Sequence, residues 1–331
     1  MCGSTAVTID VRDFIDLASE RFGAVVTEAN DDFFAPKENL IKWSAPQWIE
    51  GKYTDRGKWM DGWETRRRRD GATHDWCIVK LGARGIVAAV DVETTHFKGN
   101  YPEACAIEAG DPTTDSGQAA KWVEILPRTP LTGDSHNLFT IDAAVEATHL
   151  RLRIFPDGGV ARLRAYGRVA ADWDRLRRRP EIDLAAAAHG GFVVSCSDMF
   201  FGSRNNLIMP GDATHMGDGW ETKRRRGPGH DWSIVRLATS GTLHRVEVDT
   251  RHFKGNAPGA CDLEACALSP RTAERFDDVA WQPLVERVAL TPHAIHVFER
   301  EVRAAGPVTH VRFNIYPDGG VGRLRLYGVP R

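Results

Sequence analysis

A nine-residue stretch that combines a carboxylate with a run of cations occurs twice in the 331-residue sequence. It reads DGWETRRRR at 61–69 and DGWETKRRR at 218–226. The guanidinium group of arginine presents a planar fork of donors that matches a carboxylate, so it is a natural anchor for a small anion. We expect substrate-binding side chains here at Glu64, Arg67, Arg69, Glu221, Arg225 and Arg226. The alternative is an edge strand with solvated arginines, whose alternation places Trp63, Thr65, Arg67 and Arg69 on one face.

Two further repeated motifs bring histidine beside other polar groups. HDW occurs at 74–76 and 230–232, and HFKGN occurs unchanged at 96–100 and 252–256. Histidine titrates near physiological pH and suits acid–base catalysis, and a loop that follows a strand often carries function. The acid–base candidates are His74, His96, His230 and His252, and the binding candidates are Asp75, Lys98, Asn100, Asp231, Lys254 and Asn256. A structural histidine beside a turn is the alternative for each motif.

A carboxylate interrupts an apolar run in both copies, as Glu108 in ACAIEA and Glu264 in ACDLEA. A carboxylate in such a strand needs a partner or a chemical role, so we add Glu108 and Glu264 to the catalytic candidates. Cys105 and Cys261 correspond to each other and are expected to fill the core. The sequence contains no glycine-rich phosphate loop that opens a helix.

The residue types also suit a metal, but their spacing does not. His74, Asp75, His96 and Glu108 are possible ligands, yet no HxH or HExxH pattern is present. No cofactor is therefore predicted, and a divalent Mn or Zn ion is kept as the alternative.

These motifs belong to one long duplication. Four blocks recur in the same order, and PDGGVARLRAYG at 156–167 returns as PDGGVGRLRLYG at 317–328. A chain of this length exceeds the usual size of a single core, so two domains are expected. We predict a first domain at 1–169, a partly helical connector at 170–189 and a second domain at 190–331.

Alternating apolar and polar residues predict that each copy is all-β. The runs at 86–97, 148–155, 243–253 and 309–316 show this pattern, and PDGG turns predict a closing β-hairpin in each copy. The predicted fold is a tandem pair of homologous jelly-roll β-sandwiches. A net charge of −2 argues against nucleic-acid binding. The absence of a long apolar segment argues against a membrane span, and cysteines without metal or disulfide spacing favour the cytoplasm.

The combination DGWETRRRR, HDW, HFKGN and PDGGVARLRAYG, present twice, resembles the allantoicase family from about residue 22 to residue 328. This resemblance implies two jelly-roll domains of the galactose-binding type and a homo-oligomer. It also implies hydrolysis of allantoate to ureidoglycolate and urea. In that reaction arginines would bind the carboxylate, acidic side chains would hold the ureido N–H groups, and a lysine would stabilise developing negative charge.

Two alternatives follow from the same residues. One is a non-catalytic ligand-binding sandwich, because the fold alone does not imply an enzyme. The other is a related ureide hydrolase, for example one that acts on ureidoglycolate. The residues do not decide whether one repeat or both hold a site. Thr95 against Arg251, and the longer stretch at 44–59 against 210–217, distinguish the copies.

Overall fold

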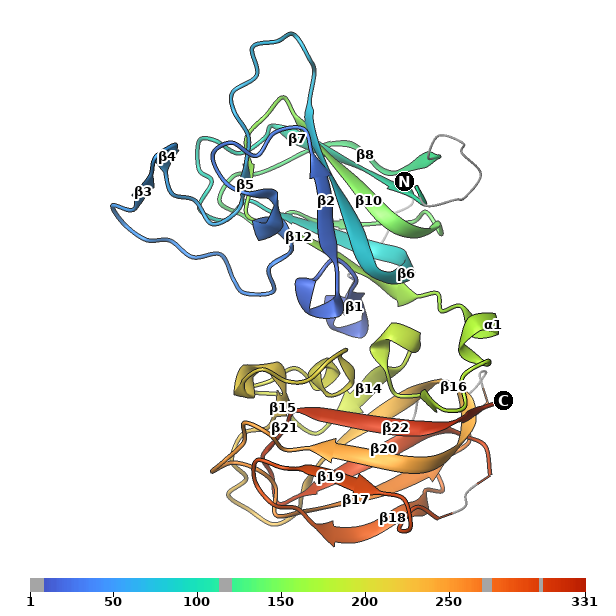
Figure 1. Cartoon of the computed structure of the whole chain (residues 1–331). Coiled ribbons are helices and arrows are strands. Elements are labelled where there is room, and N and C mark those ends of the chain that lie inside the picture. Colours follow the sequence, from blue (N-terminus) through green and yellow to red (C-terminus); the bar gives the residue numbers. More distant parts are fainter. Residues whose placement is uncertain (1–8, 113–120, 270–275, 304–305) are drawn as a thin grey trace, which may run out of the picture. The chain divides into compact units, whose positions relative to one another are not determined.

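The computed structural model describes residues 9–112, 121–269, 276–303 and 306–331. The chain divides into two compact units, 1–170 and 171–331 (Figure 1). The first unit contains the 3-10 helices η1 (Val11–Asp13), η2 (Glu20–Phe22) and η3 (Lys37–Ile41). Its strands are β1 (Ile15–Asp16), β2 (Val25–Ala29), β3 (Tyr53–Thr54), β4 (Gly57–Lys58), β5 (Trp63–Glu64), β6 (Asp75–Glu93), β7 (Ala104–Gly110), β8 (Trp122–Pro130), β9 (Leu138–Thr140), β10 (Glu146–Phe155), β11 (Gly159–Val160) and β12 (Arg162–Val169).

The second unit repeats this order of elements. It contains the helix α1 (Trp173–Leu176) and the 3-10 helices η4 (Ala187–His189), η5 (Arg204–Ile208) and η6 (Met216–Asp218). Its strands are β13 (Ile182–Asp183), β14 (Phe192–Cys196), β15 (Trp220–Glu221), β16 (Asp231–Asp249), β17 (Ala260–Cys266), β18 (Gln282–Ala289), β19 (Ile295–Phe298), β20 (Val308–Tyr316), β21 (Gly320–Val321) and β22 (Arg323–Pro330). No helix in the part of the chain that the model describes is both long and apolar enough to span a membrane.

Each unit is an antiparallel β-sandwich, which confirms the predicted fold class. The main path of the first is β1-β12-β6-β10-β7-β8, with β2 and β9 also paired to β6, and the second follows the same path from β13 to β18. The long strand β6 pairs with β10 and β2 near its start and with β12 and β9 near its end. A strand that changes partners along its length joins the two layers of a sandwich.

All of the predicted connector at 170–189 except its first residue belongs to the second unit. Its short helix α1 ends before Pro180, but β13 pairs with β22 just as β1 pairs with β12. Strand pairing of the second repeat therefore begins at Ile182.

The predicted hairpins at the PDGG turns are wrong. In the first unit β10 pairs with β6 and β7, whereas β12 pairs with the other half of β6 and with β1. The turn carries the chain from one layer to the other, because β10 and β12 form their backbone hydrogen bonds with different halves of the long strand β6. The second unit does the same around β16.

The predicted alternation along DGWETRRRR is also wrong beyond its start. Only Trp63 and Glu64 form a strand, which pairs with β11, and the arginines follow in irregular structure. Trp63 is fully buried and donates from Nε1 to the Asp31 carbonyl at 2.7 Å. The equivalent Trp220 makes the same bond to Asp198 at 2.8 Å. The tryptophan thus anchors the motif while the cations leave the sheet.

His310 on β20 provides a test of core packing in the second repeat. Its side chain is buried among Phe276 and neighbouring strand residues, and burial lowers the pKa of His310 to about 4. A histidine with a lowered folded pKa favours folding above its unfolded pKa of about 6.5, and that contribution is lost as the pH falls toward 4.

We predict that His310→Gln makes the protein less sensitive to acid. Between about pH 7 and about pH 4.5 the wild type should lose about 2 kcal/mol more of its free energy of unfolding than the variant does. Guanidinium unfolding at both pH values measures the difference. Equal losses in the two proteins would contradict the assignment.

Candidate functional site

The HFKGN loop lies at one end of the first sandwich, directly after β6. Its start is fixed by backbone geometry, because His96 has a φ of 71° and donates its N–H to Asp134 Oδ1 at 2.8 Å. Phe97 is buried against Gly159 of the PDGG turn, where an added Cβ would lie 1.9 Å from the ring. That contact requires glycine. At the equivalent Gly320 an added Cβ would lie 2.0 Å from the Phe253 ring, so the same packing holds both loops.

A pocket of about 650 Å³ opens beside this loop in the first repeat. It is lined by Trp48, Lys58, Met60, His96, Lys98, Gly99 and Asn100. Two of these side chains are cationic and none is a carboxylate, so the wall favours an anionic ligand. Three predicted residues, His96, Lys98 and Asn100, are therefore brought together here.

The hydrogen bond of His96 determines which of its ring nitrogens is free. Nε2 lies 3.3 Å from the Pro46 carbonyl oxygen, which can only accept, so Nε2 carries the proton of the neutral ring. Nδ1 then keeps its lone pair and can act as a base. His252 has the same arrangement, with Nε2 at 2.9 Å from the Ala213 carbonyl oxygen.

Glu64 orients one wall of the pocket. Its Oε1 accepts from Asn100 Nδ2 at 2.7 Å, and burial raises the pKa of Glu64. Because the amide nitrogen is engaged, Asn100 Oδ1 is left to accept from a ligand N–H. Glu221 and Asn256 form the same pair at 2.6 Å.

The arginine runs contribute an ion pair behind the loops. Arg68, which the sequence prediction passed over, binds the buried Asp75 at 2.5 Å, and Asp75 also accepts from Asn30 at 2.6 Å. Arg67 and Arg69 are exposed instead.

The second repeat has the same ion pair, between Arg225 and the buried Asp231 at 2.5 Å, while Arg226 is exposed. By position in the motif Arg225 corresponds to Arg68, so the predicted pairing of Arg225 with Arg67 or Arg69 was out of register. The structure therefore places Asp75 and Asp231 in ion pairs within the protein.

His74 immediately precedes β6 and does not line the pocket. Its ring lies 5.3 Å from that of Phe155, and burial, with Arg153 and Arg68 nearby, lowers the pKa of His74. His230 contacts Tyr316 at 4.6 Å between ring centroids, and its Nε2 lies 3.3 Å from Asn314 Oδ1. These two histidines do not line the pocket.

Glu108 and Glu264 lie within their strands, away from the HFKGN loops. Glu108 accepts from Arg151 Nε of the neighbouring strand at 2.6 Å, and Glu264 accepts from Arg312 Nε at 2.8 Å. The partners that the sequence analysis required are thus cross-strand arginines. Lys254, the counterpart of Lys98, is exposed.

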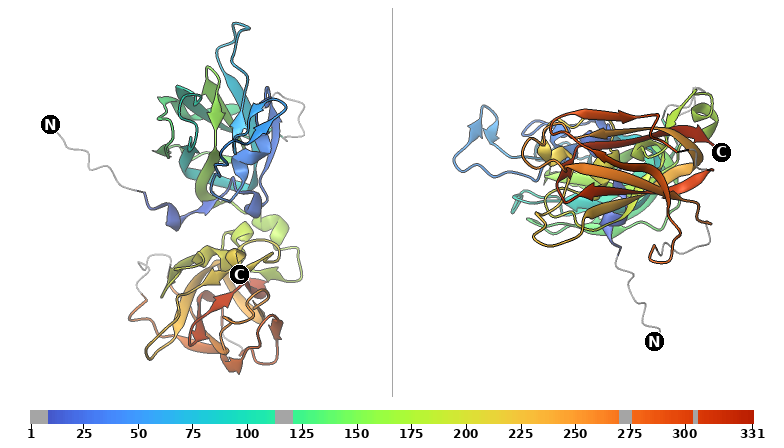
Figure 2. Two further views of the ribbon diagram at one scale, coloured as in Figure 1. Left: turned by 90° about the vertical axis from the view of Figure 1, so that its left-hand side faces the viewer. Right: turned by 90° about the horizontal axis from the view of Figure 1, so that it is seen from below.

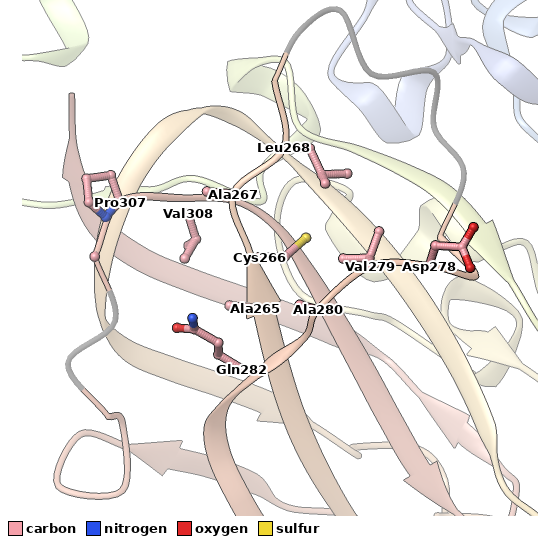
Figure 3. Close-up of a pocket in the computed structure, with 11 residues that line it drawn as sticks. Ala265, Cys266, Ala267, Leu268, Asp278, Val279, Ala280, Gln282, Pro307 and Val308 are labelled. Atoms are coloured by element: carbon pink, nitrogen blue, oxygen red, sulfur yellow. The ribbon is translucent and has the colours of Figure 1, made fainter.

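Another pocket, of about 910 Å³, lies in the second repeat and is shown in Figure 3. Its wall combines the apolar side chains of Cys266, Leu268, Val279 and Pro307 with the polar side chains of Asp278 and Gln282. None of the predicted site residues lines it. Among the residues described by the model, no group of three or more His, Cys, Asp or Glu side chains could hold a metal ion.

Trp48 and Lys58 are pocket residues that the sequence analysis missed. Both lie in the stretch 44–59, whose counterpart at 210–217 is half as long. That difference in length was visible in the sequence, but it did not show which residues reach the HFKGN loop. The stretch includes the β3–β4 hairpin, which projects from the body of the first unit (Figure 2).

A buried arginine closes the base of this stretch. Arg162 is fully buried and donates to the Ser44 carbonyl at 2.9 Å, the Asp61 carbonyl at 3.0 Å and Asp61 Oδ2 at 2.8 Å. Asp61 also accepts from the Gln47 backbone at 3.0 Å. The two ends of the stretch are therefore tied to one guanidinium.

The fold and site define a tandem β-sandwich protein with a cationic, histidine-containing pocket at a loop end. The model of the allantoicase repeat matches residues 15–170 and 182–331, so the chain belongs to the allantoicase family. It is 48% identical over 320 residues to probable allantoicase 1 of Burkholderia mallei, covering 96% of this chain and 95% of the relative. It is 46% identical to a probable allantoicase of Pseudomonas aeruginosa, covering 97% of each. The crystal structure of allantoicase from Saccharomyces cerevisiae matches with a TM-score of 0.80 at 34% identity, covering 95% and 92% of the two chains.

We predict that Arg162→Met destabilises the first repeat by about 3 to 5 kcal/mol, because it leaves the buried Asp61 carboxylate without its guanidinium partner. Unfolding in guanidinium chloride measures the loss of unfolding free energy. The double variant Asp61→Asn/Arg162→Met also removes the charge of the buried Asp61 carboxylate and should recover part of the lost stability. A single variant as stable as wild type would contradict the buried ion pair.

Proposed function

We propose that this chain hydrolyses allantoate to ureidoglycolate and urea, and that the reaction takes place in the pocket of the first repeat. The observation that carries the activity is its near full-length identity of 45–48% to proteins named probable allantoicase. The pocket supports the location, because it combines an imidazole with two cations and a fixed amide.

The substrate matches the chemistry of these side chains. Allantoate carries one carboxylate and two ureido groups on a single carbon. The cations of the pocket suit the carboxylate, and Asn100 Oδ1 is free to accept from a ureido N–H because Glu64 holds its amide nitrogen. A neutral sugar could accept hydrogen bonds from the two lysines but would lack the charge that strengthens them.

The reaction exchanges one ureido group for a hydroxyl. The bond between the central carbon and the departing ureido nitrogen breaks, and a bond to the oxygen of water forms at that carbon. One proton of water passes to the departing nitrogen, which leaves as urea. His96 Nδ1 is the group in the pocket with a free lone pair to take up the proton of water. Lys98 lies in the same wall and would stabilise developing negative charge.

The catalytic roles predicted for His74, His230, Glu108 and Glu264 stay predictions, since these residues lie outside the pocket. A homo-oligomer, which rests on the family resemblance, and a cytoplasmic location, which rests on the cysteines, are likewise proposals. The cysteines Cys77, Cys105, Cys196, Cys261 and Cys266 are free thiols, in keeping with a reducing compartment.

Urea release from allantoate by the purified protein tests the proposal, first after dialysis against a chelator and then with Mn²⁺ or Zn²⁺ restored. We expect turnover in the chelated sample, because the pocket wall offers one imidazole and no carboxylate as ligands. Ureidoglycolate serves as the control substrate and should release little urea.

Two outcomes would contradict the account. Activity that depends on restored metal would make some His, Asp or Glu residues ligands. No turnover by folded protein under either condition would favour the ligand-binding module instead.

A further inference from the structure

The stretch 44–59, called the insert below, gives the first repeat a wall that the second repeat lacks. In the second repeat, residues 210–217 take its place. The two stretches begin alike at the loop histidine, since Pro46 bonds His96 and Ala213 bonds His252. Only the insert then continues into a β-hairpin that returns Lys58 to the pocket.

A tryptophan ring of the insert lies near both a cation and the loop imidazole. Lys58 Nζ is 4.1 Å from the centroid of the Trp48 ring, and the His96 ring is 5.8 Å from the same tryptophan. Trp48 is itself fixed, because its Nε1 donates to Glu50 at 2.9 Å. The ring is 40% exposed, so one part of it is open to a ligand.

Lys58 differs from the other lysine of the pocket in its partner. Lys98 Nζ lies 3.7 Å from the Asp134 carboxylate, whereas in the described part of the chain no carboxylate forms an ion pair with Lys58. A cation positioned by an aromatic face keeps its hydrogen-bond donors free. Lys58 is therefore the side chain of the pocket best placed to bind a carboxylate.

The second repeat keeps the loop but changes its surroundings. Met216 Sδ approaches Asn256 Nδ2 at 3.7 Å, on the amide that corresponds to Asn100. His293 Nδ1 accepts from the His252 N–H at 2.9 Å, where the first repeat uses the Asp134 carboxylate. No counterpart of Trp48 or Lys58 exists in the shorter stretch 210–217.

We infer that the insert recognises the substrate: Lys58 binds the carboxylate of allantoate, the Trp48 ring packs against a planar ureido group, and the first repeat alone turns over. This inference rests on the proposed function and assigns its specificity to two residues outside the repeated motifs. The second repeat keeps HFKGN because Phe253 packs its loop against Gly320.

The test is the steady-state kinetics of Lys58→Met, with Lys52→Met as the matched control. Lys52 lies on the same insert, with its Nζ 3.9 Å from the Trp59 ring centroid, and does not line the pocket. Loss of a charge-assisted contact should raise KM for allantoate on the order of 10- to 100-fold, with a smaller change in kcat. Lys58→Arg should restore part of the affinity, and Lys52→Met should behave as wild type.

Inhibition by methylenediurea, which has the two ureido groups of allantoate and no carboxylate, separates recognition from folding. Its inhibition constant should be the same for wild type and Lys58→Met. Trp48→Leu should raise this constant, and Trp48→Phe should leave it unchanged. If Lys58→Met weakened the binding of allantoate and of methylenediurea equally, Lys58 would have only a structural role and the inference would be overturned.

The failures are distinguishable. A wild type that releases no urea defeats the proposed function. An active wild type with an unchanged KM in Lys58→Met defeats the inference alone.

Discussion

A buried guanidinium in each sandwich sets the geometry of the loops around it. Burial of a charge is costly unless its N–H groups find acceptors, so Arg162 must keep the Asp61 carboxylate and the carbonyls around it in place. Arg323 meets the same requirement with the carbonyls of Gly211 and Asp218 at 3.0 and 2.8 Å. The same buried arginine thus holds the ends of the corresponding stretch in both repeats. The stretch itself, 44–59 or 210–217, can vary in length without disturbing the core.

This arrangement allows two copies with the same motifs to differ in the residues that surround their loops. The glycine of the PDGG turn and the buried phenylalanine of HFKGN hold the loop identically in both. The insert adds a hairpin to the first copy, and with it an aromatic ring and a cation. Conserved packing and changed binding are therefore properties of different residues, so the repetition of a motif does not by itself indicate a repeated active site.

Much of the fold could be predicted from the sequence. The duplication, the all-β class and the placement of HFKGN after a long strand follow from repeats and from alternation of apolar residues. Alternation gives the face of a residue but not its neighbouring strand. That is why the PDGG turn was taken for a hairpin, and why Arg151 was not recognised as the partner of Glu108. The strand ends at Glu64, and the arginines leave it after the buried Trp63 and Thr65.

The candidate site was only partly predictable, for a related reason. His96, Lys98 and Asn100 share one motif, and the structure keeps them together in the pocket. Trp48 and Lys58 lie about 40 to 50 residues away along the chain, and the stretch that holds them, whose two ends are tied to Arg162, brings them to the same wall. Sequence spacing carries no signal for such a contact.

Urea release by His96→Asn and His252→Asn, compared in parallel, tests most directly whether the chemistry belongs to the first repeat. Asparagine tolerates the left-handed backbone of both positions, so each variant should fold as wild type does. We expect His96→Asn to lower kcat on the order of 100-fold or more, as for loss of a general base, and His252→Asn to keep nearly full activity. Equal losses in the two variants, or a loss confined to His252→Asn, would contradict the assignment.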